Sequence, residues 1–268
     1  MGRFDGKLLV SDMDATLLND NHEVTAENFD AINYFISEGG LFTVASGRMI
    51  DAVRVYLDRI PVNAPAITYN GAKIYSFRDE CTIYEKTIEE KRKAAYRKVF
   101  ETTDFGLEVY SKEHIYVLRE CFETERLKST CYSVTYSMPD EIWDEAWTKA
   151  LIIGDDKELD SFEPVYKSQY DTGYSVRSGK YYLDIVANGV SKGAGVKYLA
   201  NQFGILEKDI YTVGDNMNDY EMVTLTPNGF AVSNAVDKLK KAAKDIVPSN
   251  NESAIAYIIE NKIMQTKQ

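Results

Sequence analysis

Short apolar runs alternate with amphipathic helical segments at both ends of this chain, and this alternation constrains the fold more than any other feature. Residues 8–10 (Leu-Leu-Val) predict a buried strand, a helix follows that stops at Gly39-Gly40, and residues 41–45 predict the next strand. The same order returns late in the chain, where a helix predicted over 191–203 precedes a strand predicted over 210–213. Strands that alternate with helices favour a doubly wound, parallel α/β sheet.

The middle of the chain follows a different pattern. It is rich in Tyr, Thr and Glu, and short alternating runs such as 108–110 and 181–183 predict antiparallel strands. This is the α+β pattern of a separate small domain. We therefore predict a core made of residues 1–80 and 187–268, and an inserted α+β domain made of residues 81–186.

Composition narrows the classes of partner. Among 268 residues, 42 are Asp or Glu and 31 are Lys or Arg, which gives a formal net charge of −11. This excess of negative charge repels a phosphate backbone, so we expect no nucleic-acid partner. No apolar stretch approaches the roughly 20 residues that cross a bilayer, and the apolar run near the N-terminus is too short for a signal peptide. We predict a cytoplasmic monomer with a small-molecule substrate, no membrane association and no obligate protein partner.

Polar motifs directly follow the predicted core strands or open the helix after the inserted domain. These motifs are Asp12-Met13-Asp14, Ser46-Gly47-Arg48, Lys192 and Gly214-Asp215-Asn216-Met217-Asn218-Asp219. In open α/β sheets, ligands bind beyond the carboxyl ends of the strands. We therefore expect the four motifs to converge on one crevice, although they lie far apart in the sequence.

The residue types in these motifs suit phosphoryl transfer. Asp12 and Asp215 offer hard carboxylate oxygens of the kind that bind Mg²⁺, and this metal offsets the repulsion between a carboxylate and an anionic phosphoryl group. A carboxylate can form an aspartyl-phosphate, and Asp14 can protonate the leaving oxygen and later activate water. Ser46 supplies a hydroxyl donor. Lys192 supplies a positive charge on the first turn of a helix, where free N–H groups also favour an anion.

In their order and strand context, the four motifs resemble those of haloacid-dehalogenase phosphatases. More narrowly, the chain is similar to the Cof-type sugar phosphatases of subfamily IIB, and the similarity spans nearly its whole length. This resemblance implies a Rossmann-like core with an inserted cap of the C2 type that selects the leaving group. It also implies Mg²⁺ as the cofactor and small phosphorylated metabolites, sugar phosphates above all, as substrates.

The resemblance also implies roles for individual residues. It makes Asp12 the nucleophile and a metal ligand. Asp14 becomes the general acid and base, with its backbone carbonyl on the metal, and Asp215 completes the protein ligands of the metal. The residues expected to hold the phosphoryl group are Ser46, Gly47, Lys192 and Asn218.

Four further residues follow from the same comparison of motifs. Asp219 is expected to act through a metal-bound water or by orienting Lys192. Asn70 and Arg48 match family motifs and are expected near the substrate. Ala15 stands where the family usually has glycine, and it would restrict the backbone if that position requires a positive φ.

Two alternative functions remain open. A phosphomutase or phosphotransferase of the same superfamily would use the same residues and pass the phosphoryl group to a second hydroxyl instead of water. A non-catalytic phosphometabolite-binding protein would keep the fold without turnover, although it has no need for both Asp12 and Asp14. A calcium-binding EF-hand at Asp12 is excluded, because Leu17 occupies the position that requires glycine and the preceding residues predict a strand.

Overall fold

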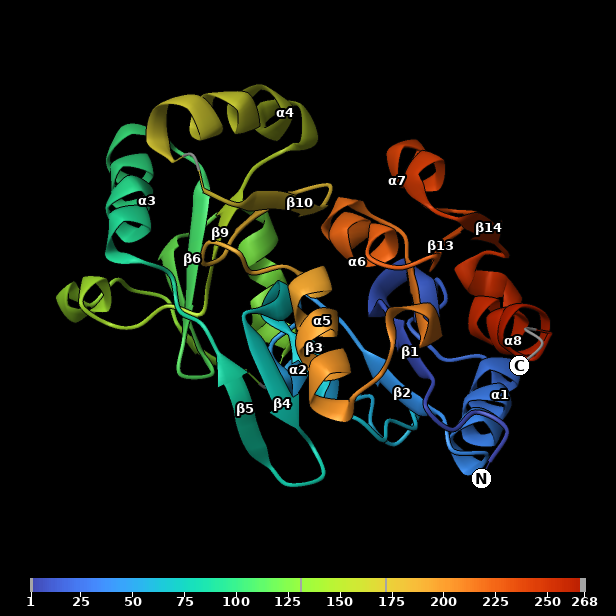
Figure 1. Ribbon diagram of the computed structural model, residues 1–268. Helices are drawn as coiled ribbons and strands as arrows, with labels where there is room; N and C mark the ends of the chain where they lie inside the picture. The colour runs from blue at the N-terminus through green and yellow to red at the C-terminus, as the bar shows by residue number, and fades with distance from the viewer. Residues whose placement is uncertain (1, 131, 172, 266–268) are drawn as a thin grey trace.

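A parallel sheet forms the centre of the molecule in the computed structural model, which describes residues 2–130, 132–171 and 173–265 (Figure 1). The strand order is β14-β13-β12-β1-β2. The strands are β1 (Leu8–Ser11), β2 (Leu41–Val44), β12 (Ile210–Gly214), β13 (Asn228–Val232) and β14 (Asp245–Val247). In β1, Leu8 lies opposite Leu41 of β2 on one side and Ile210 of β12 on the other. The predicted fold class, a doubly wound parallel core with an inserted α+β cap, is confirmed.

Helices cover both faces of this sheet. They are α1 (Ala26–Ser37), α2 (Ile50–Arg54), α5 (Lys192–Phe203), α6 (Tyr220–Thr224), α7 (Asp237–Ala242) and α8 (Ala254–Ile258). Leu9 belongs to the cluster that includes Phe35 of α1 and Ile255 of α8, and these two helices lie side by side near both chain termini (Figure 1). Val10 instead joins the cluster that includes Leu199 of α5. Successive side chains of β1 thus point to opposite faces of the sheet and pack in two separate hydrophobic clusters.

A second sheet, in the order β10-β11-β9-β6-β7-β8, lies in the inserted region. Its strands are β6 (Gly106–Ser111), β7 (His114–Arg119), β8 (Ser133–Thr135), β9 (Lys149–Ile153), β10 (Ser175–Gly179) and β11 (Tyr182–Ile185). Ile152 on one face packs in a cluster with residues of α3 (Glu90–Thr102) and α4 (Asp156–Val165). Leu151 on the opposite face joins a cluster with Met49 and Tyr69, which lie outside the inserted region. This second face is therefore turned toward the parallel sheet.

A short antiparallel sheet made of β3 (Ala66–Thr68), β4 (Lys73–Ser76) and β5 (Cys81–Glu85) connects the two regions. The sequence predicts residues 66–69 as a third core strand, but the backbone of β3 pairs with the segment after β2 by an isolated bridge between Ala45 and Ile67. The turn at Tyr69–Gly71 reverses the chain, so that β3 pairs with β4 instead. The division into residues 1–80, 81–186 and 187–268 remains our proposal. The parallel sheet draws its strands from the outer ranges, and the second sheet lies within the middle one.

Helix ends agree with their sequence signals in α1 and α5. The Thr25 side chain caps α1 by accepting the Asn28 N–H, and α5 ends at Gly204 in the left-handed conformation. The helix predicted over 50–58 is shorter than expected, because α2 ends at Arg54 and the chain continues in three-residue turns. No helix in the described ranges is long and apolar enough to cross a membrane. The cytoplasmic location, the monomeric state and the absence of other partners stay predictions.

Candidate active site

The four sequence motifs meet at the carboxyl ends of β1, β2 and β12. Asp12 follows β1, and its N–H donates a hydrogen bond of 3.0 Å to the Val213 carbonyl of β12. Ser46 lies just beyond β2 and donates its N–H to the Ile67 carbonyl over 2.8 Å. Asp215 follows β12 directly. The convergence expected from an open α/β sheet is therefore present in the structure.

Lys192 links these motifs from the first position of α5. Its side chain is buried, with 1% exposed, and its ammonium lies 2.5 Å from Asp12 Oδ1 and 2.6 Å from Asp219 Oδ1. The other carboxylate oxygen of Asp219 accepts the N–H groups of Asp215 at 3.0 Å and Asn216 at 3.1 Å. Asp219 thus contacts both Lys192 and the loop after β12. Its two expected functions, orienting Lys192 or acting through a metal-bound water, stay predictions.

The carboxylates of Asp12, Asp215 and Asp219 form a buried acidic cluster, with one oxygen from each lying within 4.8 Å of the others. Burial and the neighbouring negative charges raise the pKa of Asp12 and of Asp215, and Lys192 only partly opposes this effect. When all three acids ionise, Lys192 therefore neutralises only part of their negative charge. A small divalent cation with a preference for oxygen ligands fits this donor set.

Asp14 lies beside this cluster and is paired with Arg48. The guanidinium donates hydrogen bonds of 2.8 Å and 2.7 Å to the two carboxylate oxygens, and it stacks 4.9 Å from the centre of the Tyr56 ring. Burial alone would raise the pKa of Asp14, but the hydrogen bonds and charge of Arg48 hold that pKa below its usual value. In this arrangement, Asp14 is ionised at neutral pH.

Asn70 connects the inserted region to the site. It adopts a left-handed backbone with φ of 56° in the turn between β3 and β4. Its Nδ2 donates a hydrogen bond of 2.5 Å to Asp184 of β11, and its Oδ1 accepts one of 3.2 Å from Asn218. The side chain is 1% exposed. Asn70 therefore orients Asp184 and Asn218 from behind, and the predicted contact between Asn70 and substrate stays a prediction.

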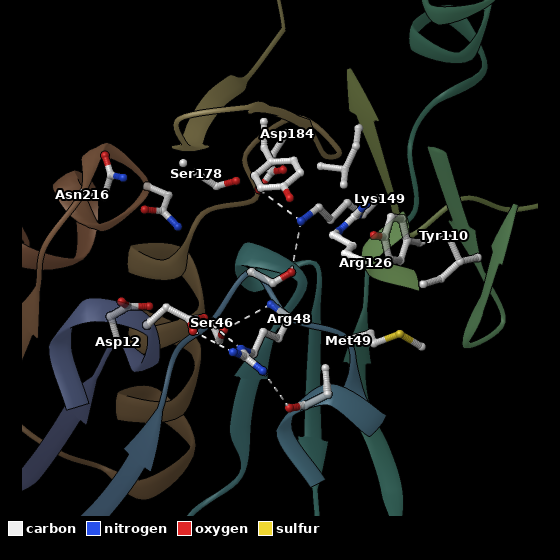
Figure 2. A pocket seen from close by; sticks show the side chains of 18 of the residues that line it. Asp12, Ser46, Arg48, Met49, Tyr110, Arg126, Lys149, Ser178, Asp184 and Asn216 are labelled. Carbon is white, nitrogen blue, oxygen red and sulfur yellow. Dashed lines mark hydrogen bonds and ion pairs between the residues drawn. The ribbon is translucent and has the colours of Figure 1, made fainter. Parts of the chain in front are cut away.

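A cavity of about 590 Å³ opens over the acidic residues, and both regions of the chain line it (Figure 2). From the parallel sheet, the lining includes Asp12, Asp14, Ser46, Gly47, Arg48, Asp215 and Asn218. From the inserted region, it includes Tyr110, Arg126, Lys149, Tyr182 and Asp184. Volumes of this order suit small metabolites.

A family model for haloacid dehalogenase-like hydrolases matches residues 9–259. The chain belongs to this family. It is 26% identical over 283 residues to the 5-amino-6-(5-phospho-D-ribitylamino)uracil phosphatase YwtE of Bacillus subtilis, a match that covers 95% of this chain and 97% of YwtE.

Solved structures show the same fold. The crystal structure of TM0651 from Thermotoga maritima matches with a TM-score of 0.78 and 25% identity, covering 95% of this hydrolase and 96% of that chain. The subclass IIB sugar phosphatase BT4131 matches with a TM-score of 0.84 and 20% identity, covering 96% and 99%. The predicted superfamily, Cof-type group and enzyme class, a phosphatase, are confirmed, whereas the roles of single residues stay predictions.

In this hydrolase, Ala15 adopts a φ of 56°, which is left-handed backbone. The position therefore does require a positive φ, and alanine is strained there by roughly 1–2 kcal/mol relative to glycine because of its Cβ. The Ala15 carbonyl accepts a hydrogen bond of 2.8 Å from Asn234, which holds the loop in place.

Sequence reasoning missed three charged side chains of the hydrolase that line the cavity from the inserted region: Arg126, Lys149 and Asp184. Asp184 carried a usable signal, because it is an acid within the otherwise apolar and aromatic strand Tyr182–Ile185 and is fully buried. Buried acids are rare unless they are paired. Arg126 has no comparable local signal, since basic residues are common in polar segments. Lys149 opens the apolar strand Lys149–Ile153 and is itself buried.

Proposed function

We propose that this hydrolase is a Mg²⁺-dependent phosphohydrolase that cleaves small phosphorylated metabolites through an aspartyl-phosphate on Asp12. The observation that carries the proposal is the buried Lys192, which is held between Asp12 and Asp219. It lies next to the acidic cluster, of which Asp12 and Asp215 line the cavity. Bound between Asp12 and Asp215, with the Asp14 carbonyl as a further ligand, Mg²⁺ would offset the repulsion between the nucleophile and an anionic phosphoryl group.

The first half of the reaction transfers the phosphoryl group to the protein. A carboxylate oxygen of Asp12 attacks phosphorus, and the bond from phosphorus to the ester oxygen breaks. The Lys192 ammonium, 2.5 Å away, partly opposes the rise in the pKa of Asp12 that burial causes, and a bound metal would favour the ionised carboxylate further. Asp14 donates a proton to the departing oxygen. Because Arg48 holds Asp14 ionised, we infer that their ion pair opens when the substrate enters, which lets Asp14 take up that proton.

The second half returns the phosphoryl group to water. Asp14, now ionised, accepts a proton from a water molecule whose oxygen attacks phosphorus and displaces Asp12. Lys192 and the Ser46 hydroxyl hold the phosphoryl oxygens, and Asn218 adds an amide contact. The products are inorganic phosphate and an alcohol. Asp12 is again a free carboxylate, and Asp14 releases its proton to solvent when the pair with Arg48 forms again.

The substrate class follows from the relatives and the cavity together. YwtE acts on a compound with a phosphorylated ribityl chain, and BT4131 is a sugar phosphatase. The cavity of this chain combines aromatic rings with charged side chains that are already paired, such as Arg126 with Glu108. We therefore propose phosphomonoesters of sugars or sugar alcohols as substrates.

The test is phosphate release from a panel of hexose, pentose and polyol phosphates, with Mg²⁺ and with a chelator. We expect release that requires Mg²⁺, and we expect the Asp12→Asn variant to fold normally and lose at least about a thousandfold in kcat. Normal turnover in Asp12→Asn would rule out Asp12 as the nucleophile. Formation of an isomeric phosphate without free phosphate would instead support the phosphomutase alternative.

A further inference from the structure

Asp184 projects from the inserted region into the same cavity, and it has no counterpart among the sequence motifs. It is fully buried on β11, directly opposite Leu151 of β9. Side chains on this face of the sheet are turned toward the parallel sheet, as shown by the packing of Leu151 with Met49. Figure 2 shows Asp184 and Lys149 on one side of the cavity, with Asp12, Ser46 and Arg48 on the other.

Only one oxygen of this carboxylate is occupied by the described part of the chain. Oδ2 accepts a hydrogen bond of 2.5 Å from Asn70 and forms an ion pair with the Lys149 ammonium at 3.1 Å. Among the residues that the structure describes, none donates a hydrogen bond to the buried Oδ1. Leaving a buried acceptor without a partner costs about 1–3 kcal/mol, and more when the group is charged. Oδ1 is therefore an acceptor suited to a donor on a molecule in the cavity.

Asn218 presents a second acceptor of the same kind from the parallel-sheet side. Its Nδ2 donates to Asn70, while its buried Oδ1 has no donor among the described residues. Asn70 thus contacts both Asp184 and Asn218, and the Oδ1 atom of each of these two residues lacks a donor among the described residues. Both residues line the cavity that contains the phosphoryl-transfer residues.

The surrounding charges decide which donor fits. Lys149 already neutralises Asp184 and also donates to the Gly47 carbonyl at 3.1 Å, so an ammonium group on the ligand would meet a cation close by. Arg126 is the other basic residue that lines the cavity from the inserted region, and it donates two hydrogen bonds of 2.8 Å to the buried Glu108. The basic residues on this side of the cavity are therefore paired with acids, whereas Oδ1 of Asp184 still lacks a donor among the described residues. This combination suits neutral hydroxyl donors.

We propose that Asp184 is a specificity-determining residue whose Oδ1 accepts a hydrogen bond from a hydroxyl of the leaving group. The hydrolase then prefers monophosphates of neutral polyhydroxy compounds over phosphomonoesters of the same size that lack hydroxyls. The inference rests on the proposed phosphohydrolase function and adds to it the residue that reads the leaving group.

The test compares two substrates of equal carbon number, sorbitol 6-phosphate and n-hexyl phosphate. Wild-type enzyme should show a kcat/KM at least about tenfold higher for sorbitol 6-phosphate, the range expected for a hydrogen bond to a charged group. In Asp184→Asn, the amide oxygen keeps the contacts with Asn70 and Lys149, and the amide NH₂ replaces the free oxygen. This variant should lose most of the preference, because its kcat/KM falls far more for sorbitol 6-phosphate than for hexyl phosphate.

Glu113→Gln is the matched control. Glu113 is another acid of the inserted region, and it accepts hydrogen bonds from Lys73 at 2.7 Å and Tyr69 at 2.8 Å without lining the cavity. It should therefore keep the wild-type preference. Equal losses on both substrates in Asp184→Asn, or no preference in wild type, would overturn the proposal.

A binding measurement separates this inference from the proposed function. Calorimetry of sorbitol 6-phosphate and hexyl phosphate, in an Asp12→Asn background with and without Asp184→Asn, does not depend on turnover. A preference for sorbitol 6-phosphate that disappears with Asp184→Asn supports the role of Asp184 even if no phosphate is released by the wild-type enzyme. The absence of any such preference contradicts that role even if hydrolysis is rapid.

Discussion

At Asp14, burial and an ion pair act on one carboxylate in opposite directions. Burial favours the neutral acid, whereas the two hydrogen bonds from Arg48 favour the ionised form and win. An acid that must give a proton to a leaving oxygen works best with a pKa near the operating pH. While it is paired with Arg48, Asp14 is therefore ionised and has no proton to donate to the leaving oxygen.

Replacing Arg48 by methionine should shift the pH dependence of catalysis. Without the guanidinium, the pKa of Asp14 rises, so Asp14 keeps its proton to higher pH. The basic limb of the pH profile of kcat/KM therefore shifts to higher pH. Arg48→Lys keeps the charge but not the paired hydrogen bonds, and it should shift the limb less. A profile that keeps its wild-type limb while kcat/KM falls would show that Arg48 serves substrate binding alone.

At the scale of elements, the turn Tyr69–Gly71 presses against the start of α5 and so positions Lys192. Gly71 has a φ of +98°, and a Cβ added there would lie 2.1 Å from the Ser191 carbonyl oxygen. Ser191 caps α5 by accepting the Ala194 N–H at 3.1 Å. A side chain at residue 71 must therefore displace the helix end that carries Lys192.

Gly71→Ala should consequently lower kcat/KM by at least about tenfold, because displacements near 1 Å at a reacting group have costs of this order or larger. Gly204→Ala is the matched control, since Gly204 also has a positive φ, of +66°, but a Cβ there meets nothing within 4 Å. Both variants should lose roughly 1 kcal/mol of stability in denaturant titrations from the left-handed backbone alone. Equal activity in the two variants would contradict the proposed link between this turn and Lys192.

The parts of the site that the sequence predicts are those tied to local patterns. Asp12, Ser46 and Asp215 each follow an apolar run, and Lys192 directly follows the serine that caps a helix. In a parallel α/β sheet these positions share one edge whatever the length of the inserted region, so their convergence needs no knowledge of long-range pairing. The roles assigned to them still await measurement.

The contacts that the sequence does not reveal depend on strand pairing across long distances. Asp184 faces the cavity because β11 pairs with β9 in a register that places it opposite Leu151, and a shift of one residue would turn it away. Likewise, the apolar pattern of β3 is compatible with pairing to either β2 or β4, and the left-handed turn Tyr69–Gly71 brings β4 beside β3. Local periodicity does not distinguish between such partners.

For the whole molecule, the acidic cluster couples metal binding to the stability of a core built from both ends of the chain. Asp12 and Asp215 come from segments on either side of the inserted region and meet only in the folded state. Burial and mutual repulsion raise their folded-state pKa values above those of the unfolded chain. Without metal, the folded state therefore holds protons that the unfolded chain has released, and stability falls as pH rises above about 4 toward these raised pKa values.

Mg²⁺ should reverse this loss, because it binds the ionised carboxylates and binds the folded state alone. At a hundredfold excess over its dissociation constant, a ligand adds about 2.7 kcal/mol, or several degrees in Tm for a chain of this size. We expect the increase in Tm on adding Mg²⁺ to be clearly larger at pH 8 than at pH 5.5, where protons compete for the same oxygens. Asp215→Asn removes one of the repelling charges, so the metal-free variant should melt higher than wild type at pH 8 and respond little to Mg²⁺. An equal response at the two pH values, or an undiminished response in Asp215→Asn, would show that the metal binds elsewhere.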